Sequence, residues 1–366
     1  MSNQLGASPT ENKNGAHGTE PQIVLGANSD NPPQSRRWWL RALGASFSLL
    51  FVGVLTALLA SVWFRSAVDA PGPLAQSTTI DIQRGTGVRR ITDQITEAEL
   101  IDKPVLFMLQ VRLRQSARRL KAGEFVFPAH ASINDVIDVL EKGKPVLYEF
   151  TVPEGLTSQV IAQLINDHPI LVGDPIPAPP EGSVLPETYA FPRGYSRLQM
   201  LEAMQSAMQN VLLTSWQLRD TTITLRTPFE AAVLASIVEK ETGVASERSL
   251  VASVFHNRLN IGMRLQSDPT VIYGLTGGVG RLGRPLRRAD LKDKSPYNTY
   301  VHGGLPPTPI TNPGRMAIEA VMRPEKSDYV YFVADGTGGH AFAKTLAEHN
   351  RNVAAWQKFR TEQEKQ

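Results

Sequence analysis

The chain has no cysteine among its 366 residues. This absence excludes disulfide frameworks, thiolate nucleophiles and cysteine-ligated metal sites. The formal net charge is only +3, which is too small to argue by itself for nucleic acid as a partner. A local excess of arginine and lysine between residues 84 and 121 has two interpretations: a solvated helix face, or a surface that faces anionic lipid or an anionic wall polymer.

Charged residues are also absent from one long segment. From Ala42 to Phe64 the sequence is dominated by Leu, Val, Phe and Ala, and a helix needs about 20 such residues to cross a bilayer. A cleaved signal peptide, the alternative, would have a shorter apolar stretch than this. Three arginines precede the segment and only one closely follows it, so the positive-inside rule places the N-terminus in the cytoplasm (Arg36, Arg37, Arg41; Arg65). We predict a disordered cytoplasmic tail over 1–41, a transmembrane helix over 42–64 and a short linker over 65–77.

Strand and helix patterns alternate after this anchor. A strand at 79–82, helices near 88–95 and 103–111, a strand at 121–127 and a helix at 132–142 make a small unit. A related strand, glycine turn and helix recur at 148–164 as a partial second copy. The remainder, to about residue 358, combines helices with Gly- and Pro-rich loops and one clear strand at 329–334. The pattern predicts an α+β fold.

One predicted helix carries a candidate catalytic group. Thr227, Pro228 and Glu230 are typical of a helix start with a capping box, and Gly243 is typical of the residue after a helix end. At about 100° per residue, Glu241 shares an apolar stripe with Leu234, Ile237 and Val238. The same geometry predicts that Glu239 and Lys240 point to solvent.

A carboxyl on the buried face of a helix has a raised pKa, because burial disfavours its charged form. Such a group can be protonated near neutrality and donate its proton to a leaving-group oxygen. The structural alternative for Glu241 is a pairing near the helix end, for instance with Arg248. Position alone does not decide between these two roles.

Several polar residues downstream are candidates for a binding groove. Gln266 and Ser267 have no evident structural task, whereas Asp268 before Pro269 suits a helix N-cap. A long irregular loop follows, and loops of that length are often functional. Its Tyr and Asn residues, interleaved with glycines, suit carbohydrate. His340 after two glycines is a candidate hydrogen-bond donor near the groove, or a structural histidine.

Several long motifs in order resemble the endolytic murein transglycosylase (YceG-like) family, over about residues 78–358. The segments that carry the resemblance are Val152–Gly155, Leu185–Tyr189, Ala235–Thr242, Val251–Leu259, Gly262–Gly274, Tyr297–Tyr300, Gly304–Pro307 and Tyr331–His340. The resemblance implies a LysM-like module over 78–150 and a catalytic domain over 151–360. It also implies a single-pass protein of the bacterial inner membrane with its catalytic domain in the periplasm.

For chemistry, the resemblance implies a lyase that cuts the β-1,4 bond between N-acetylmuramic acid and N-acetylglucosamine inside nascent peptidoglycan strands. The products end in 1,6-anhydro-N-acetylmuramic acid, and the cut helps to end strand elongation, with peptidoglycan synthases as candidate partners. Glu241, the second Glu of the Glu-Lys-Glu run, matches the family's catalytic residue, and no cofactor or nucleic acid is expected. We expect the substrate to be bound by residues in or beside the same segments: Glu187, Tyr189, Gln266, Ser267, Asp268, Tyr297, Asn298, Thr299 and His340.

Three other interpretations remain open. A hydrolytic muramidase would use Glu241 with a second carboxylate, Asp268 or Glu187. A non-catalytic wall-binding scaffold of the division or elongation machinery would not need Glu241. A metalloenzyme is disfavoured, because no two of the histidines form a His-x-x-x-His pair, and we expect no metal.

Overall fold

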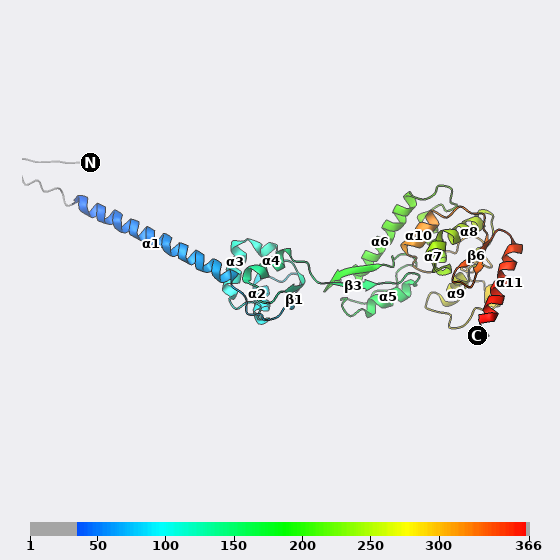
Figure 1. Ribbon diagram of the computed structural model, residues 1–366, viewed down its shortest axis with the longest axis horizontal. Coiled ribbons are helices and arrows are strands. Elements are labelled where there is room, and N and C mark those ends of the chain that lie inside the picture. The colour runs from blue at the N-terminus through cyan, green and yellow to red at the C-terminus, as the bar shows by residue number, and fades with distance from the viewer. Residues whose placement is uncertain (1–34, 364–366) are drawn as a thin grey trace, which may run out of the picture. The chain divides into compact units, whose positions relative to one another are not determined.

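The computed structural model describes residues 35–363, and the chain divides into two compact units, residues 1–67 and 68–366. Most of the predicted cytoplasmic tail, residues 1–34, lies outside the described residues. The predicted mixture of helices and strands is confirmed: helices predominate, and three separate pairs of antiparallel strands accompany them (Figure 1).

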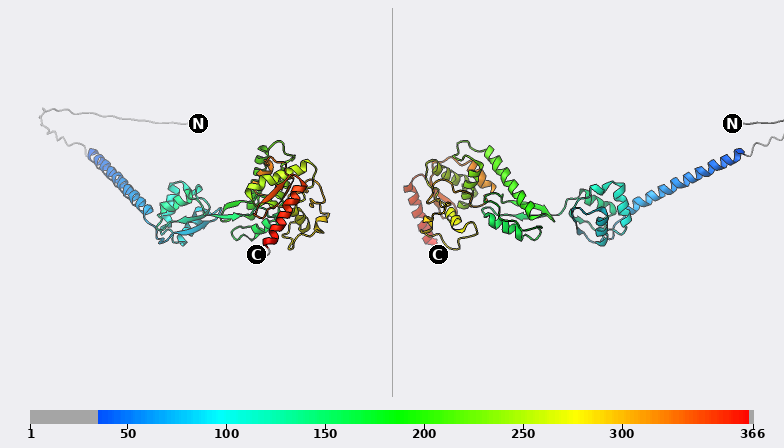
Figure 2. Two further views of the ribbon diagram at one scale, coloured as in Figure 1. Left: turned by 45° about the vertical axis from the view of Figure 1, so that its right-hand side comes forward. Right: turned by 180° about the vertical axis from the view of Figure 1, so that it is seen from behind.

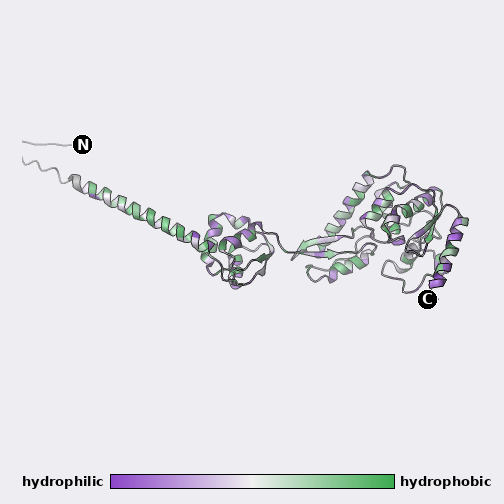
Figure 3. Cartoon of the chain, viewed as in Figure 1, coloured by the Kyte–Doolittle hydropathy of each residue, from purple (hydrophilic) through white to green (hydrophobic). Residues whose placement is uncertain are grey.

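Helix α1 (Ser35–Asp69) contains the predicted transmembrane segment. Within it, Trp38–Asp69 is long and apolar enough to cross a membrane, and none of its most apolar stretch is buried inside the protein. Its large side chains are largely exposed, as the 72% exposure of Phe47 illustrates, and Figure 3 shows the apolar colouring along the helix. A helix of this kind has no apolar partner within the described chain, which is compatible with a single membrane span.

The second unit begins with a small module of two strands and three helices. Its elements are β1 (Thr78–Ile82), α2 (Val88–Glu97), α3 (Pro104–Leu113), a short 3₁₀ turn η1 (Ser116–Arg118), β2 (Gly123–Phe127) and α4 (Ile133–Lys142). Strands β1 and β2 are antiparallel, with Thr78 opposite Phe127. Their inward side chains and the apolar faces of the helices make a closed core in which Ile95, Phe107 and Phe125 are fully buried.

The predicted linker is partly built into this module. Val68 is buried, the Gly72 amide donates to the carbonyl of His130 at 3.2 Å, and the His130 amide donates to the carbonyl of Leu74 at 2.7 Å. A Cβ on Gly72 would collide with the carbonyl oxygen of Ala131. Residues 68–74 therefore pack against the loop before α4.

A second group of elements follows: β3 (Leu147–Thr151), α5 (Ser158–Asp167), β4 (Thr188–Pro192) and α6 (Arg197–Gln217). Strands β3 and β4 pair antiparallel, with Thr151 opposite Thr188. They share a core with α5 and the start of α6, in which Ile161, Ile165 and Met204 are fully buried. The sequence predicts β3 and α5 but not β4, because β4 is short, ends in a proline and forms only through pairing with a strand some 40 residues earlier.

The remainder surrounds one buried helix, α7 (Pro228–Glu241). The other elements are η2 (Ala245–Glu247), α8 (Arg248–Asn260), α9 (Asp268–Thr276), η3 (Asp290–Lys292), α10 (Arg315–Met322), β5 (Tyr331–Ala334), β6 (His340–Ala343) and α11 (Leu346–Gln363). Helices α6, α8, α9 and α10 all contact α7 or its neighbours, and α11 packs along the β5–β6 hairpin (Figure 2). The predicted strand at 329–334 is present as β5, whereas its partner β6 was not predicted.

Candidate active site

Helix α7 begins largely as its sequence predicts. The Thr227 hydroxyl accepts from the Glu230 amide at 3.1 Å, and Pro228 occupies the first turn. The predicted reciprocal capping box is wrong, because the Glu230 carboxylate accepts from the amide of Arg226 instead. Gly243 follows the C-cap residue Thr242, as predicted, but without the left-handed backbone typical of a glycine there: the helix ends at Glu241, and the chain leaves it in an extended conformation at Thr242.

The prediction that Glu239 is solvated is also wrong. Every residue from Ala231 to Val238 is buried, so α7 is covered on all sides and not only along one stripe. The Glu239 side chain is 6% exposed and lies 3.6 Å from the Arg248 guanidinium, and it accepts from the Gly314 amide at 2.9 Å. Burial raises the pKa of Glu239, and the Gly314 hydrogen bond opposes this. Lys240 is exposed, as predicted.

Glu241 lies at the end of α7 with its carboxyl surrounded by protein. The Ser267 hydroxyl donates to Glu241 Oε1. Burial raises the pKa of Glu241, the Ser267 hydrogen bond opposes this, and the nearby Asp268 carboxylate raises the pKa further. Arg248 does not pair with it, because that guanidinium contacts Glu239 and the Glu154 carboxylate, the latter at 3.3 Å. The structure thus removes the structural explanation for Glu241 that the sequence left open.

Ser267 is aimed by a strained residue and by backbone hydrogen bonds. Gln266 has a φ of +48°, an uncommon conformation for a residue with a Cβ, and its side chain is exposed while Ser267 is buried. The Ser267 amide donates to the hydroxyl of Thr299 at 3.0 Å, and the Thr270 hydroxyl donates to the Ser267 carbonyl at 2.6 Å. These contacts hold the serine hydroxyl against the carboxyl.

Asp268 is not the helix N-cap that its sequence predicts. Helix α9 starts at Asp268, and Ser267 occupies the cap position without a side-chain cap bond. The exposed Asp268 carboxylate instead accepts from the Tyr300 hydroxyl at 2.7 Å. Burial raises the pKa of Tyr300, and the hydrogen bond to Asp268 raises it further. Asp268 is therefore an acidic group beside Glu241 that remains open to solvent.

The loop at 295–300 contributes to the site mainly through buried residues that hold other residues in place. Asn298 and Thr299 are 0% and 2% exposed, and the Asn298 amide donates to the carbonyls of Leu291 and Asp293 at 3.2 and 2.7 Å. The Tyr297 hydroxyl lies 2.8 Å from that of Thr308. Of these three predicted binding residues, only Tyr297 is partly exposed, whereas the other two hold the loop and, through Thr299, position Ser267.

His340 and Arg258 also lie near Glu241. Both are close enough for their charge to oppose the rise in its pKa. His340 Nδ1 lies 2.7 Å from the Glu247 carboxylate, which also accepts from the His340 amide at 2.9 Å. The Arg258 guanidinium is buried and donates to the carbonyls of Leu265 and Val330.

Sequence reasoning missed Glu247 and Arg258. Both belong to the motif-rich segment after Glu241, but their partners are 7 to 93 residues away. The only local signal was the small residue before His340: a Cβ on Gly339 would lie 2.5 Å from Glu247 Oε1. The glycine permits the carboxylate to reach the histidine.

Glu187 and Tyr189 lie at the start of β4. Glu187 pairs with Arg315 at 3.0 Å, and the Tyr189 hydroxyl donates to the carbonyl of Leu185 at 2.7 Å. Within residues 35–363, no hydrogen bond joins either side chain to Glu241 or Ser267. The same described residues contain no group of three or more His, Asp or Glu side chains placed to hold a metal ion.

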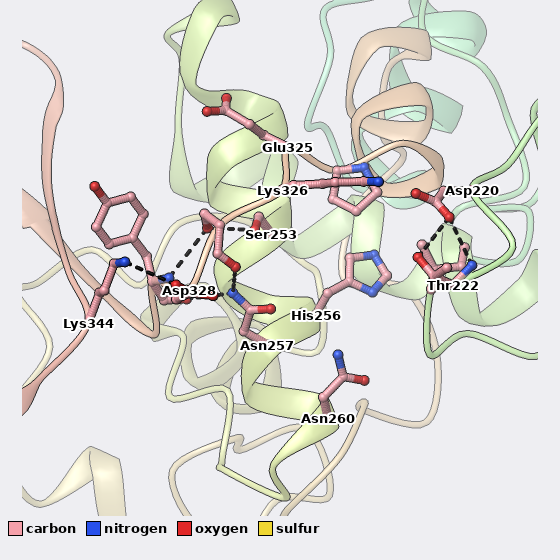
Figure 4. Close-up of a pocket in the computed structure, with 14 residues that line it drawn as sticks. Asp220, Thr222, Ser253, His256, Asn257, Asn260, Glu325, Lys326, Asp328 and Lys344 are labelled. Atoms are coloured by element: carbon pink, nitrogen blue, oxygen red, sulfur yellow. Dashed lines mark hydrogen bonds and ion pairs between the residues drawn. The ribbon is translucent and has the colours of Figure 1, made fainter.

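A polar hollow of about 600 Å³ lies on another side of α8 (Figure 4). Its side chains are largely paired with one another. The Asn257 amide donates to the carbonyls of Ser327 and Tyr329 at 2.7 and 2.9 Å, and Lys344 lies 3.0 Å from Asp328. Figure 4 shows His256 next to Asn257 on α8. The contacts that line this hollow therefore join α8 to the segment that leads into β5, and they help to position the hairpin that carries His340.

The chain is similar to known proteins of one family. The YceG-like family matches residues 80–355. The chain is 29% identical over 365 residues to an endolytic murein transglycosylase of Streptococcus pneumoniae, covering 84% of this chain and 65% of that protein. It is 30% identical over 308 residues to an endolytic murein transglycosylase of Bacillus subtilis, covering 75% of this chain and 83% of that protein. A crystal structure of a YceG-like protein from Listeria monocytogenes is 30% identical, with a TM-score of 0.46, and covers 75% of this chain and 98% of that one.

Proposed function

The chain belongs to the YceG-like family, and we propose on this basis that it is a lytic transglycosylase that cuts peptidoglycan glycan strands internally. The names of its relatives support the activity, although the chain spans only about two thirds of the pneumococcal protein (65%). The observation that carries the proposal is Glu241: a surrounded carboxyl with a raised pKa, held by the Ser267 hydroxyl.

In this mechanism Glu241 acts first as an acid and then as a base. Its protonated carboxyl donates to the bridging oxygen of the β-1,4 bond between N-acetylmuramic acid and N-acetylglucosamine, and the bond from that oxygen to the muramoyl C1 breaks. The resulting carboxylate then accepts the proton of the muramoyl 6-hydroxyl while the oxygen of that hydroxyl forms a bond to C1. The product is a 1,6-anhydro ring, and no water is consumed. The Ser267 hydrogen bond stabilises the carboxylate between the two steps.

The remaining parts of the chain fit a protein that works on the outer side of a membrane. We include in the proposal that the uncharged part of α1, residues 42–64, is a single span of the bacterial inner membrane, with the arginines that precede this part on the cytoplasmic side. The strand–helix–helix–strand order of β1, α2, α3 and β2, with the two strands paired, supports a LysM-like module over 78–150, and 151–360 is the catalytic domain. Glycan strands and the peptidoglycan synthases that extend them are the proposed substrate and partners, so that a cut ends strand elongation.

A hydrolytic muramidase is the second candidate, and one observation favours it. Asp268 is a solvent-exposed carboxylate next to Ser267, near enough to raise the pKa of Glu241, and a second carboxylate is what hydrolysis by inversion or retention requires. Glu187 is a weaker choice for that role, because it pairs with Arg315.

The two reactions differ in the ends that they leave. Full-length protein in detergent is incubated with uncrosslinked glycan strands, and the products are identified by mass spectrometry. We expect anhydro ends, loss of all products with Glu241→Gln, and retained cleavage with Asp268→Asn. If the products carry reducing ends, and these are no longer formed by Asp268→Asn, the protein is a muramidase and not a transglycosylase. If Glu241→Gln cleaves as fast as the wild type, both proposed reactions are wrong.

A further inference from the structure

An open cleft of about 570 Å³ is lined by residues that neighbour the candidate site in the sequence. Lys240 directly precedes Glu241, and Pro269 directly follows Asp268. One wall is a face of α9. The cleft-lining residues of that helix are Pro269, Ile272, Tyr273 and Thr276, whose spacing places them on a single side of a helix. Because Ser267 occupies the N-cap position of this helix and donates to Glu241, the wall is joined directly to the candidate catalytic group.

The opposite wall is a glycine-rich loop over residues 278–284. The Thr157 hydroxyl donates to the carbonyl of Gly278 at 2.7 Å. A Cβ on Gly278 would lie 3.0 Å from the Tyr273 ring, so the glycine lets the loop close against α9. At the far end Arg284 pairs with Asp290 through two hydrogen bonds of 2.6 and 2.9 Å. The loop is thus anchored at both ends and forms a defined wall.

The chemistry of the cleft combines an apolar surface with positive charge. Ile272, Leu282 and the Tyr273 ring contribute apolar surface, and no acidic residue lines the cleft. Lys240 and Arg281 supply cations: Lys240 donates weakly to the carbonyl of Gly155 at 3.4 Å. The exposed Arg281 has no ion pair among the described residues of the chain.

This combination fits a short anionic peptide better than a sugar. A sugar ring requires many hydrogen-bonding groups, and the cleft offers few beyond its cations, whereas small aliphatic side chains and carboxylates match an apolar floor and a basic rim. Peptidoglycan carries such a chain on the lactyl group of muramic acid: a short peptide that contains alanyl methyl groups and free carboxylates.

We propose that the cleft between α9 and the loop at 278–284 binds the peptide stem of the muramic acid unit next to the cut, with Arg281 recognising a stem carboxylate. The proposal rests on the peptidoglycan-cleaving function above. Its consequence is that the enzyme selects strands that still carry stems, which is the state of newly made wall.

The test compares two substrates that differ only in their stems. Glycan strands with intact stems and the same strands stripped of stems by an amidase are supplied to the full-length protein, and initial rates of cleavage are measured. The wild type is expected to cut stem-bearing strands at least about threefold faster, a preference in the range of one exposed charge pair. Arg281→Ala removes most of this preference, and Arg281→Glu reduces the rate on stem-bearing strands by about fivefold or more.

Rates on stripped strands are expected to stay unchanged in both variants, because Arg281 touches only the stem. The matched control is Arg288→Glu, which changes the net charge equally from an exposed position in the same region but does not line the cleft; it keeps the wild-type preference. Equal wild-type rates on the two substrates, or equal losses on both with Arg281→Glu, overturn the stem assignment alone. A wild type that cleaves neither substrate overturns the function itself.

Discussion

Ser267 offers the sharpest test of how Glu241 works. Replacing it with alanine removes the hydroxyl that donates to the Glu241 carboxyl and leaves the backbone contacts of residue 267 in place. The hydrogen bond favours the charged form and so lowers the pKa of Glu241 against the effect of burial. Ser267→Ala should therefore raise that pKa further.

The size of the effect follows from the strength of such a bond. A hydrogen bond to a charged group contributes about 1.5–3 kcal/mol, and because Glu241 retains some solvent exposure the lower end applies. A change of about 1.4 kcal/mol alters the ratio of protonated to charged carboxyl about tenfold. At a pH where the wild-type rate is already falling, the protonated fraction of Glu241 in the variant is then about tenfold higher than in the wild type.

The assay is the dependence of kcat/KM on pH, from acidic to mildly alkaline solutions. If Glu241 is the general acid, the alkaline limb of the profile moves to higher pH in Ser267→Ala, and the plateau falls because a weaker acid protonates the leaving oxygen less readily. Ser327→Ala is the control, since its hydroxyl contacts Ser253 on another side of α8 and should leave the limb in place. A limb that stays fixed, or moves to lower pH, in Ser267→Ala would refute the reasoning.

Three further outcomes follow from the same contacts. Arg258→Met leaves the buried carbonyl of Leu265 and the half-buried carbonyl of Val330 without their donor and should lower the free energy of unfolding by about 2–4 kcal/mol, measured by urea denaturation. Glu241→Gln should raise the free energy of unfolding at neutral pH by on the order of 1 kcal/mol, but should leave it unchanged at a pH below the ordinary carboxyl pKa. The reason is that a carboxyl whose pKa is raised by folding makes the protein less stable as the pH rises through that pKa. The same difference between variant and wild type at both pH values would contradict this. Gly339→Ala should displace Glu247 from His340 and lower kcat/KM about tenfold with the circular dichroism spectrum intact, so full activity would show that this pair is dispensable.

Local patterns in the sequence predicted the features that depend on short stretches of chain. The absence of charge from Ala42 to Phe64 predicts a long apolar helix whatever surrounds it, and α1 is that helix. The helix predicted over 132–142 is present as α4, and its start is fixed by a capping box between Ser132 and Asp135, a contact that spans three residues. The periodicity of α7 selected Glu241, but it treated the helix as having one buried face.

The tertiary structure decided what depends on distant neighbours. Glu239 is buried because Gly314 and Arg248 come to α7 from other elements, which no count along one helix reveals. Asn298 and Thr299 are buried because Asn298 binds the carbonyls of Leu291 and Asp293 and Thr299 packs against Thr270 of α9.

The sequence by itself determined the long apolar helix and most of the other helices, and it singled out Glu241 as the candidate acid, because each of these depends on residues within a few turns of one another. Only the tertiary structure decided that Ser267 donates to Glu241 and that Glu247 pairs with His340. These contacts join residues 26 and 93 positions apart, and burial at Glu241, not the sequence around it, sets the pKa on which the proposed chemistry depends.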